Sequence, residues 1–198
     1  MSKKRILLFV CCAVFFLGNT IGFAQNKTET KLIQPPYLKA GDTVAIVAPS
    51  GVLKNRFDEV NRAKQLLESW NLYVVIGKHV FNQANHFAGT DEERCEDFQL
   101  ALDDPKIKAI WSARGGYGTV RILDSLDYTK FLKQPKWVIG YSDITALHNQ
   151  IHNLGVQSLH AIMGVSLPEN LEDIADSIAT FKNTLFGQPL RYALKGSK

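Results

Sequence analysis

Cysteine is scarce in this chain, and its scarcity excludes several classes of protein. Three cysteines occur among 198 residues, and two of them, Cys11 and Cys12, lie close to the N-terminus. No Cys-x-x-Cys pair and no cluster of histidine and cysteine is present, so neither a disulfide scaffold nor a structural zinc site is expected. The composition, 45% hydrophobic and 21% charged, is typical of a globular protein rather than a disordered, fibrous or multi-span membrane chain.

Long apolar runs are also missing. The longest, residues 6–17, is shorter than the roughly 20 residues that a membrane-spanning helix needs. It follows the basic residues 3–5 and precedes small residues at Gly22 and Ala24, an arrangement typical of a secretory signal peptide. We therefore predict that residues 1–24 are cleaved after Ala24 and that the protein is exported to the periplasm. A stable membrane anchor is the less favoured interpretation.

The mature chain lacks a strong excess of either charge. The full sequence carries +4, but residues 1–24 hold three of its 23 basic residues and none of its 19 acidic ones, so cleavage leaves +1. No polybasic stripe remains, and nucleic acid is not an expected partner. Cys95 becomes the sole cysteine, which excludes an internal disulfide. Because it lies in a helical pattern, Cys95 is expected to pack rather than react.

Short apolar runs alternate with segments of helical periodicity. The runs predict strands over residues 43–48, 72–76, 109–113, 137–141 and 156–160. Helical spacing, with a Thr-x-x-Glu capping box at residues 90–93, predicts helices over residues 57–70, 90–102, 119–126, 144–154 and 174–185. The alternation predicts an α/β fold, with a mostly parallel sheet flanked by helices on both faces, as in flavodoxin-like or Rossmann-like domains. Sites in such sheets lie where the strands end.

One serine stands directly between a predicted strand and a predicted helix, in the sequence Gly140-Tyr141-Ser142-Asp143. Such a turn can hold a hydroxyl at the edge of the sheet as a nucleophile, with the next amide, that of Asp143, as an oxyanion donor. The second glycine of the Gly-x-Ser-x-Gly pattern is absent. Spacing alone therefore favours the simpler interpretation, in which Ser142 caps a helix.

A second turn, Arg114-Gly115-Gly116-Tyr117-Gly118, follows the strand at residues 109–113. Glycine permits positive φ and close approach of the backbone to a ligand. The dinucleotide pattern fails at Arg121 and no Walker lysine follows, so no cofactor is expected. By itself this is a tight turn. Beside Ser142 it could supply an oxyanion amide and a guanidinium for a substrate carboxylate.

The histidines give weaker evidence about function than the two turns do. His148 and His152 are one helical turn apart, and a solvated pair is favoured over a metal site because no carboxylate ligand is evident nearby. His160 ends a predicted strand and is the one internal histidine that could act as a base for Ser142. The acidic residues 91–93 are expected to interact with the dipole of the helix they begin.

Five segments occur together in the order found in one family: residues 33–42, 45–51, 87–94, 113–118 and 140–147. From about Ile33 to about Phe186 the chain resembles the serine LD-carboxypeptidases (muramoyltetrapeptide carboxypeptidases), whose relatives include the microcin C immunity peptidases. The resemblance implies that residues 42–187 are the N-terminal, nucleophile-bearing domain. Residues 25–41 are then a leader over the surface, and residues 188–198 begin a linker or form a tail.

The resemblance implies removal of the terminal D-alanine from the murein tetrapeptide of peptidoglycan. Ser142 matches the family nucleophile. Asp143 and a glycine of the Gly115–Gly116 turn, taken as Gly116, match positions of the oxyanion hole. Arg114, Gly115 and Tyr117 are the expected substrate-binding residues.

Two departures from the family shape the expectation. The family has a second domain that supplies the glutamate and histidine of a Ser-His-Glu triad, and neither residue can be placed here. A truncated chain of low activity is therefore expected, with exposed apolar surface that favours self-association, including a homodimer. His160-Ala161-Ile162 also replaces the usual His-Gly-Pro. Two alternatives stay open: a non-catalytic binder of D-Ala-containing peptides, and a hydrolase that uses His160 as its base.

Overall fold

Residues 31–190 are described by the computed structural model, and within them five parallel strands form one sheet. The strands are β1 (Thr43–Val47), β2 (Tyr73–Ile76), β3 (Ile107–Ser112), β4 (Trp137–Gly140) and β5 (Leu159–His160). Their order, β2-β1-β3-β4-β5, is that of flavodoxin-like doubly wound sheets, which confirms the predicted fold class. The predicted signal peptide lies outside the described residues.

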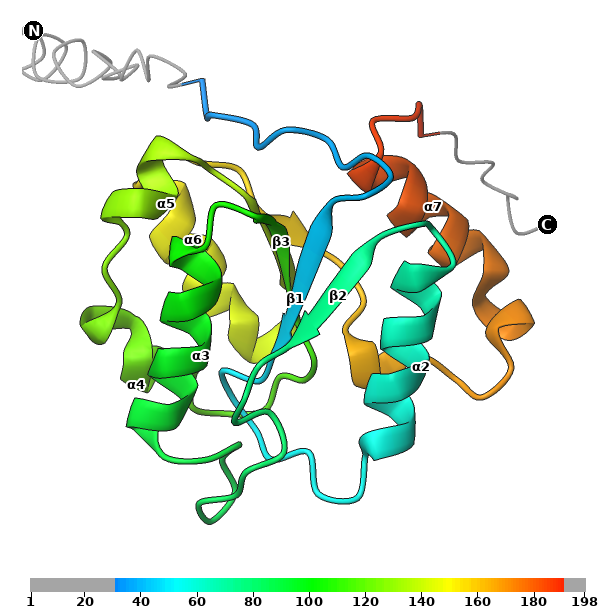
Figure 1. Ribbon diagram of the computed structural model, residues 1–198. Helices are drawn as coiled ribbons and strands as arrows, with labels where there is room; N and C mark the ends of the chain where they lie inside the picture. Colours follow the sequence, from blue (N-terminus) through cyan, green and yellow to red (C-terminus); the bar gives the residue numbers. More distant parts are fainter. Residues whose placement is uncertain (1–30, 191–198) are drawn as a thin grey trace, which may run out of the picture. The chain divides into compact units, whose positions relative to one another are not determined.

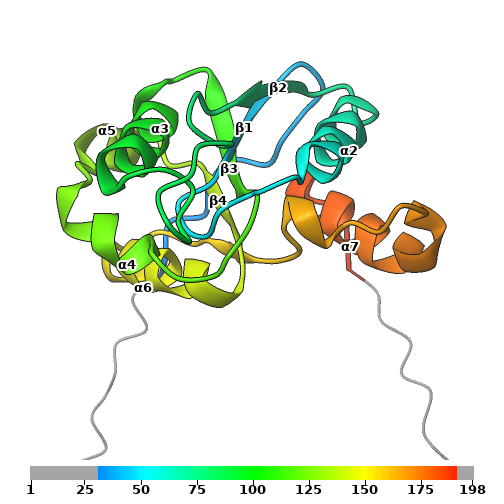
Figure 2. The ribbon, with the colours of Figure 1, turned by 90° about the horizontal axis from the view of Figure 1, so that it is seen from below.

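Helices cover both faces of the sheet. They are α2 (Phe57–Glu68), α3 (Asp91–Asp103), α4 (Thr119–Ile122), α5 (Thr129–Lys133), α6 (Thr145–Asn153) and α7 (Ala175–Leu185). Figure 1 shows α2 and α7 on one side of the strands and α3 to α6 on the other. In this fold the direction of winding changes between β1 and β3, and ligands bind at the edge where the strands end, here called the carboxyl edge. Figure 2 looks onto that edge.

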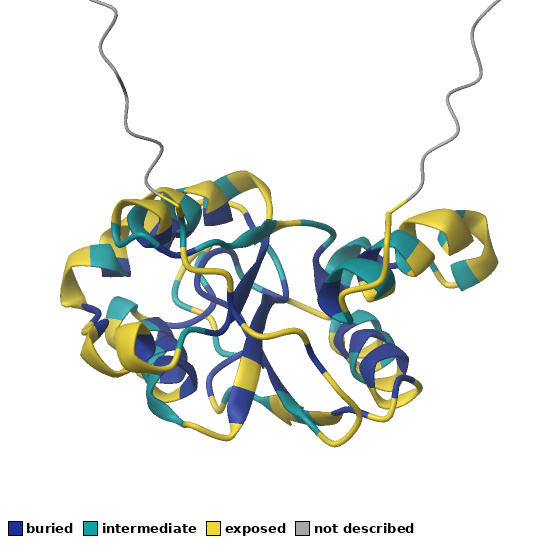
Figure 3. Cartoon of the chain, turned by 90° about the horizontal axis from the view of Figure 1, so that it is seen from above, coloured by how far each residue is buried: buried dark blue, intermediate teal, exposed yellow. Residues whose placement is uncertain are grey.

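The apolar core lies in two layers because successive residues of a strand point to opposite faces. Val44 and Ile46 of β1 belong to a cluster with side chains of α2 and α7. Ala45 and Val47 belong to a second cluster with side chains of α3 and α6. Figure 3 shows the inner faces of the helices and most of the sheet as the buried part of the domain, whereas β2 at the edge of the sheet alternates between exposed and partly buried residues. Burial on both faces explains why β1, β3 and β4 are continuous apolar runs in the sequence.

Most predicted elements are confirmed, and the capping box at Thr90 forms as expected, with Glu93 N donating to Thr90 Oγ1 at 3.2 Å. The predicted strand 156–160 is too long, since only its last two residues belong to β5. Val156 instead forms an isolated bridge with Ile33, because Gln157 N donates to the carbonyl of Ile33 at 2.9 Å. The short helix α5 was not predicted, because five residues are too few to show a helical period.

The segment before β1 is fastened to the domain at several points. The carbonyl of Pro36 accepts a hydrogen bond from Trp137 Nε1 at 2.9 Å. Leu38 is buried, and its amide donates to the carbonyl of Leu185 at the end of α7 at 2.8 Å. This segment therefore connects β4 and α7 at the edge of the sheet opposite to the carboxyl edge.

Cys95, in α3, is half-buried, and burial raises the pKa of its thiol.

The buried Lys136 binds the C-terminal end of α3. Lys136 Nζ donates to the carbonyl of Ala101 at 2.9 Å and to that of Asp104 at 2.7 Å. These two acceptors belong to the end of the helix, where backbone carbonyls lack helical partners and favour a cation. Burial lowers the pKa of Lys136 from 10.5 to about 8.

This lysine should make the free energy of unfolding depend on alkaline pH. Between about pH 8 and pH 10.5 the folded protein releases the proton of Lys136 while the unfolded chain keeps it, so stability rises with pH in this window. Relative to Lys136→Met, the wild type should gain about 2 kcal/mol between pH 7 and pH 9.5 in urea unfolding. A difference that stays constant across the window would contradict the assignment.

Candidate functional site

Ser142 occupies a strained turn at the carboxyl edge. β4 ends at Gly140, and Ser142 begins the 3-10 helix η2 (Ser142–Ile144), which leads into α6. Ser142 has φ +63°, in the left-handed region that costs a non-glycine residue about 1–2 kcal/mol. The helix-cap interpretation is wrong, because Tyr141 holds the N-cap position and no side chain caps η2. An exposed serine on a strained strand–turn–helix has the geometry of a nucleophile elbow.

The carboxylate of Asp143 joins this turn to the loops that follow β1 and β3. Its Oδ2 accepts a hydrogen bond from Ser50 Oγ at 2.6 Å and from the amide of Thr119 at 2.9 Å. Ser50 and Thr119 are fully buried. The sequence pointed to the amide of Asp143 and not to its side chain. Ser50 is 93 positions away, so only the fold brings the two together.

Glycine residues allow the backbones of the loops after β1, β3 and β4 to pack directly against one another. A methyl group on Gly115 would lie 3.2 Å from Cβ and 3.4 Å from Oγ of Ser142, which confirms that the two predicted motifs are neighbours. On the other side of this loop, Gly51 N donates to the carbonyl of Gly115 at 3.1 Å, and a methyl group on Gly51 would come within 2.8 Å of that oxygen. Gly116, with φ +123°, is exposed beside them.

The two side chains predicted to hold substrate flank this glycine turn. Arg114 is half-buried and donates through Nη1 to the carbonyl of Val52. Within residues 31–190 its guanidinium makes no other hydrogen bond, so its remaining N–H groups are available to an anion. Tyr117 is 55% exposed, and its ring centroid lies 6.3 Å from that of His86 and 6.1 Å from that of Phe87.

Arg94 supports the site, although its sequence position suggested only a helix start. Its side chain is fully buried, and Nη1 donates to the carbonyl of Pro49 at 2.6 Å and to that of Gly118 at 2.9 Å. Nη2 pairs with Asp91, which also accepts from Arg121. The hydrogen bond from Arg121 holds the pKa of Asp91 below its ordinary value. The segment 87–94 of the family resemblance was the one signal that could have marked Arg94.

The histidines depart from the expectation in one respect. The solvated pair is wrong for His148, which is half-buried and whose Nε2 donates to the carbonyl of Gly140 at 2.9 Å while Nδ1 accepts from Ser158 Oγ at 2.8 Å. Burial lowers the pKa of His148. His152 is exposed, as expected. His160 lies 6.0 Å from His148 between ring centroids, and within residues 31–190 no hydrogen bond joins a histidine to Ser142.

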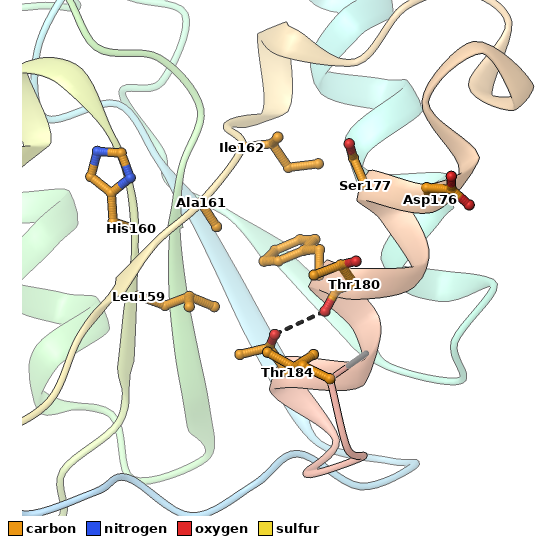
Figure 4. A pocket seen from close by; sticks show the side chains of 10 residues that line it. Leu159, His160, Ala161, Ile162, Asp176, Ser177, Thr180 and Thr184 are labelled. Atoms are coloured by element: carbon orange, nitrogen blue, oxygen red, sulfur yellow. Dashed lines mark hydrogen bonds between the residues drawn. The ribbon is translucent and has the colours of Figure 1, made fainter. Parts of the chain in front are cut away.

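A separate apolar cavity of about 510 Å³ lies between β5 and α7, lined among others by Leu159, Ile162, Thr180 and Phe181. Figure 4 shows the side chains of α7 facing the segment that follows β5, with the His160 ring on the far side of the backbone from α7. Neither Ser142 nor the glycine turn lines this cavity. It therefore differs from the site built around Ser142.

Residues 31–190 contain neither a metal-binding cluster nor a membrane-spanning helix. The described part of the chain contains no group of three or more histidine, cysteine, aspartate or glutamate side chains placed to hold a metal ion. None of the helices between residues 31 and 190 has both the length and the apolar character that a membrane span requires.

An exposed, strained serine at the start of a helix, packed against a glycine turn, defines the nucleophile-elbow class of α/β domains. The family described as the LD-carboxypeptidase N-terminal domain matches residues 44–161. The chain belongs to this family, as its motifs predicted.

Named relatives agree with that assignment. The chain is 38% identical over 142 residues to a probable murein peptide carboxypeptidase of Bacillus subtilis, covering 71% of this chain and 44% of the relative. It is 31% identical over 152 residues to the murein tetrapeptide carboxypeptidase of Pseudomonas aeruginosa, covering 73% and 49%. The solved muramoyltetrapeptide carboxypeptidase of Oxalobacter formigenes superposes with a TM-score of 0.63 at 30% identity, covering 72% and 47%. The chain thus spans about half the length of these relatives.

The backbone strain at Ser142 gives a stability prediction. Glycine tolerates φ +63° and alanine does not, so Ser142→Gly should be about 0.5–1 kcal/mol more stable than Ser142→Ala in urea unfolding. Ser177, within helix α7, is the matched control, and there the alanine variant should be the more stable one. An alanine variant at residue 142 that equals or exceeds the glycine variant would argue against the strain.

Replacing Arg94 should weaken the attachment of the loops that follow β1 and β3. Arg94→Met leaves the buried carbonyl of Pro49 without its donor and removes one of the two donors to the Gly118 carbonyl and to Asp91, and we expect a loss of about 2–4 kcal/mol in the free energy of unfolding. Arg121→Met is the control, because Arg121 pairs with the same Asp91 from a side chain that is 47% exposed. It should cost much less than Arg94→Met, because an exposed ion pair contributes little to stability. Equal losses in the two variants would refute the role of Arg94.

Proposed function

We propose that this chain is the nucleophile-bearing part of an exported serine LD-carboxypeptidase that removes the terminal D-alanine from murein tetrapeptides. The observation that carries the proposal is the strained, exposed Ser142 packed against Gly115. The names of the relatives, murein tetrapeptide carboxypeptidase among them, support the substrate class. The basic and apolar pattern of residues 1–24 supports export to the periplasm.

In the proposed reaction Ser142 Oγ attacks the carbonyl carbon of the bond between the third residue and D-alanine. The amides of Gly116 and Asp143 are assigned to the oxyanion, and the helix that begins at Ser142 directs its positive end toward it. The Ser142 proton passes to a base and then to the amine of the departing D-alanine. Water hydrolyses the resulting ester and regenerates the hydroxyl.

Arg114 is assigned to the carboxylate that makes the substrate a carboxy-terminal peptide. Its guanidinium is held from one side by the Val52 carbonyl, which fixes its position and leaves other N–H groups for a charge-assisted pair. Gly115 allows the substrate backbone to approach Ser142, and exposed Tyr117 borders the same space. The side chains of Asp143 and Arg94 act indirectly, because their hydrogen bonds position the loops that carry these groups.

The base is assigned to residues outside the described part of the protein, as in the Ser-His-Glu triad of the family. A second candidate function, a binder of D-Ala-containing peptides without hydrolysis, is favoured by the lack of a histidine hydrogen bond to Ser142 within residues 31–190. Hydrolysis with His160 as base is disfavoured, because no carboxylate within those residues orients His160.

The proposal is tested with residues 25–198 and a murein tetrapeptide. Calorimetry should detect binding that Arg114→Ala weakens by about tenfold or more, whereas the tripeptide that lacks D-alanine should not distinguish the two proteins. Mass spectrometry should detect D-alanine release that is at least about a thousandfold slower than by the Bacillus subtilis relative, because a triad without its base loses several powers of ten.

Ser142→Ala separates the candidate functions. Release that disappears in this variant supports the peptidase. Binding without any release in either protein supports the binder. Absence of binding, or release that Ser142→Ala leaves unchanged, would overturn the proposed function.

A further inference from the structure

Among residues 31–190, His148 is the one histidine whose two ring nitrogens both make hydrogen bonds, and the proposed reaction gives it no role. It lies on α6, where its Nε2 donates to the carbonyl of Gly140 at 2.9 Å and its Nδ1 accepts from Ser158 Oγ at 2.8 Å. A neutral imidazole carries one proton, so this pair of contacts requires the proton to be on Nε2. The hydroxyl of Ser158 therefore fixes the tautomer that binds Gly140.

The Gly140 carbonyl already has a hydrogen-bond partner without His148. The same oxygen accepts a hydrogen bond from the amide of Ala161 at 3.1 Å, beside the pairing of β4 with β5. A buried carbonyl needs only one partner. Leu147 and Ile151, which neighbour His148 on α6, are fully buried, so an apolar side chain at residue 148 would extend their stripe without the free-energy cost of burying an imidazole. The second hydrogen bond therefore restrains the carbonyl of Gly140 rather than satisfying it.

The restrained carbonyl belongs to the peptide group that enters the strained turn. Tyr141 follows it with extended backbone, φ −150° and ψ −175°, and Ser142 comes next at φ +63°. Gly140 is packed against the start of the helix, since a methyl group there would lie 2.9 Å from Ile144 Cγ1. A serine at positive φ relaxes to the ordinary region unless its neighbours prevent it, and the strain is of the same order as one hydrogen bond. Two donors on the entering carbonyl are therefore sufficient to oppose that relaxation.

From this arrangement we infer that His148 is a positioning residue for Ser142: through the Gly140 carbonyl, its imidazole holds the turn in the left-handed conformation that presents the hydroxyl. In this role His148 exchanges no proton with Ser142, because its Nε2 proton is bound to Gly140. The effect on the reaction rests on the proposed function, whereas the effect on the backbone is independent of any substrate. The competing explanation is that His148 only stabilises the fold, by attaching α6 to β4 and to Ser158.

The effect on the backbone is tested by urea unfolding of residues 25–198, with Ser142→Gly and Ser142→Ala each made in the wild type, in His148→Phe and in His148→Gln. In the wild type Ser142→Gly should have the higher urea midpoint, because glycine tolerates φ +63°. His148→Phe keeps a ring and removes the donor, so the turn relaxes and the gap between the two midpoints should shrink by about half or more. The side-chain amide of glutamine can replace the Nε2 donor, so His148→Gln should keep the gap.

A histidine that only stabilises the fold would give a different result. His148→Phe would then lower both midpoints by the same amount and leave the gap unchanged, which would overturn the inference. His152→Phe is the matched control, because His152 is an exposed histidine on the next turn of α6, and it should keep the wild-type gap. Long-range proton–nitrogen NMR correlations of the wild type require no substitution. We expect them to place the proton of His148 on Nε2, and a proton on Nδ1 would also overturn the inference.

The effect on the reaction is measured as D-alanine release at saturating murein tetrapeptide. His148→Phe should lower the rate about tenfold, the effect of losing one restraint of hydrogen-bond strength, while calorimetry gives an unchanged affinity for the tetrapeptide. His148→Gln should stay within about twofold of the wild-type rate, and His152→Phe should equal the wild type.

The two experiments separate failure of this inference from failure of the proposed function. An unchanged rate in His148→Phe, or a loss confined to affinity, would overturn the positioning role and leave the proposed function in place. Failure of the wild type to bind or to cleave the tetrapeptide would overturn the proposed peptidase alone, because the unfolding experiment decides the role of His148 without a substrate.

Discussion

The buried guanidinium of Arg94 is the interaction on which the arrangement of the site depends. It reaches from α3 to the carbonyls of Pro49 and Gly118, in the loops after β1 and β3. Burying a cation costs free energy that the hydrogen bonds of its Nη1 and Nη2 atoms offset, so these loops are held where those bonds can form. Asp143 then attaches the turn after β4 to the same two loops, through Ser50 and Thr119.

This cross-linking explains how a strained residue persists at the centre of the site. Ser142 adopts a left-handed backbone that its own chemistry disfavours, and such a conformation lasts only where the surroundings determine it. On the C-terminal side of Ser142, the carboxylate of Asp143 is held by its hydrogen bonds. On the N-terminal side, Gly140 is buried and its carbonyl accepts a hydrogen bond from His148. The exposed hydroxyl is consequently presented by a rigid frame rather than by a free loop, which suits a nucleophile that must meet its substrate in one geometry.

The carboxyl edge also explains how segments that are far apart in the sequence form one site. Parallel strands bring every strand end to one edge, so residues far apart in sequence can contribute to one extended ligand site. Ser142 and the glycine turn follow β4 and β3, and Ser50 and Gly51 follow β1. The apolar cavity beside β5 and α7 is separate from this site.

Local sequence patterns establish the fold class and locate the two turns of the site, whereas the role of Ser142 came from the resemblance to a family, because spacing alone favoured a helix cap. Strands buried on both faces must be continuous apolar runs, and each motif is contiguous, so Ser142 and Gly115 can be named from the sequence alone. Where a contact depends on distant residues, local pattern carries no information. The pairing of Asp143 with Ser50, the reach of Arg94, the hydrogen bonds of His148 and the shortened β5 all arise from tertiary packing. Each needs partners from different strands or loops, and only the packed sheet places those side by side.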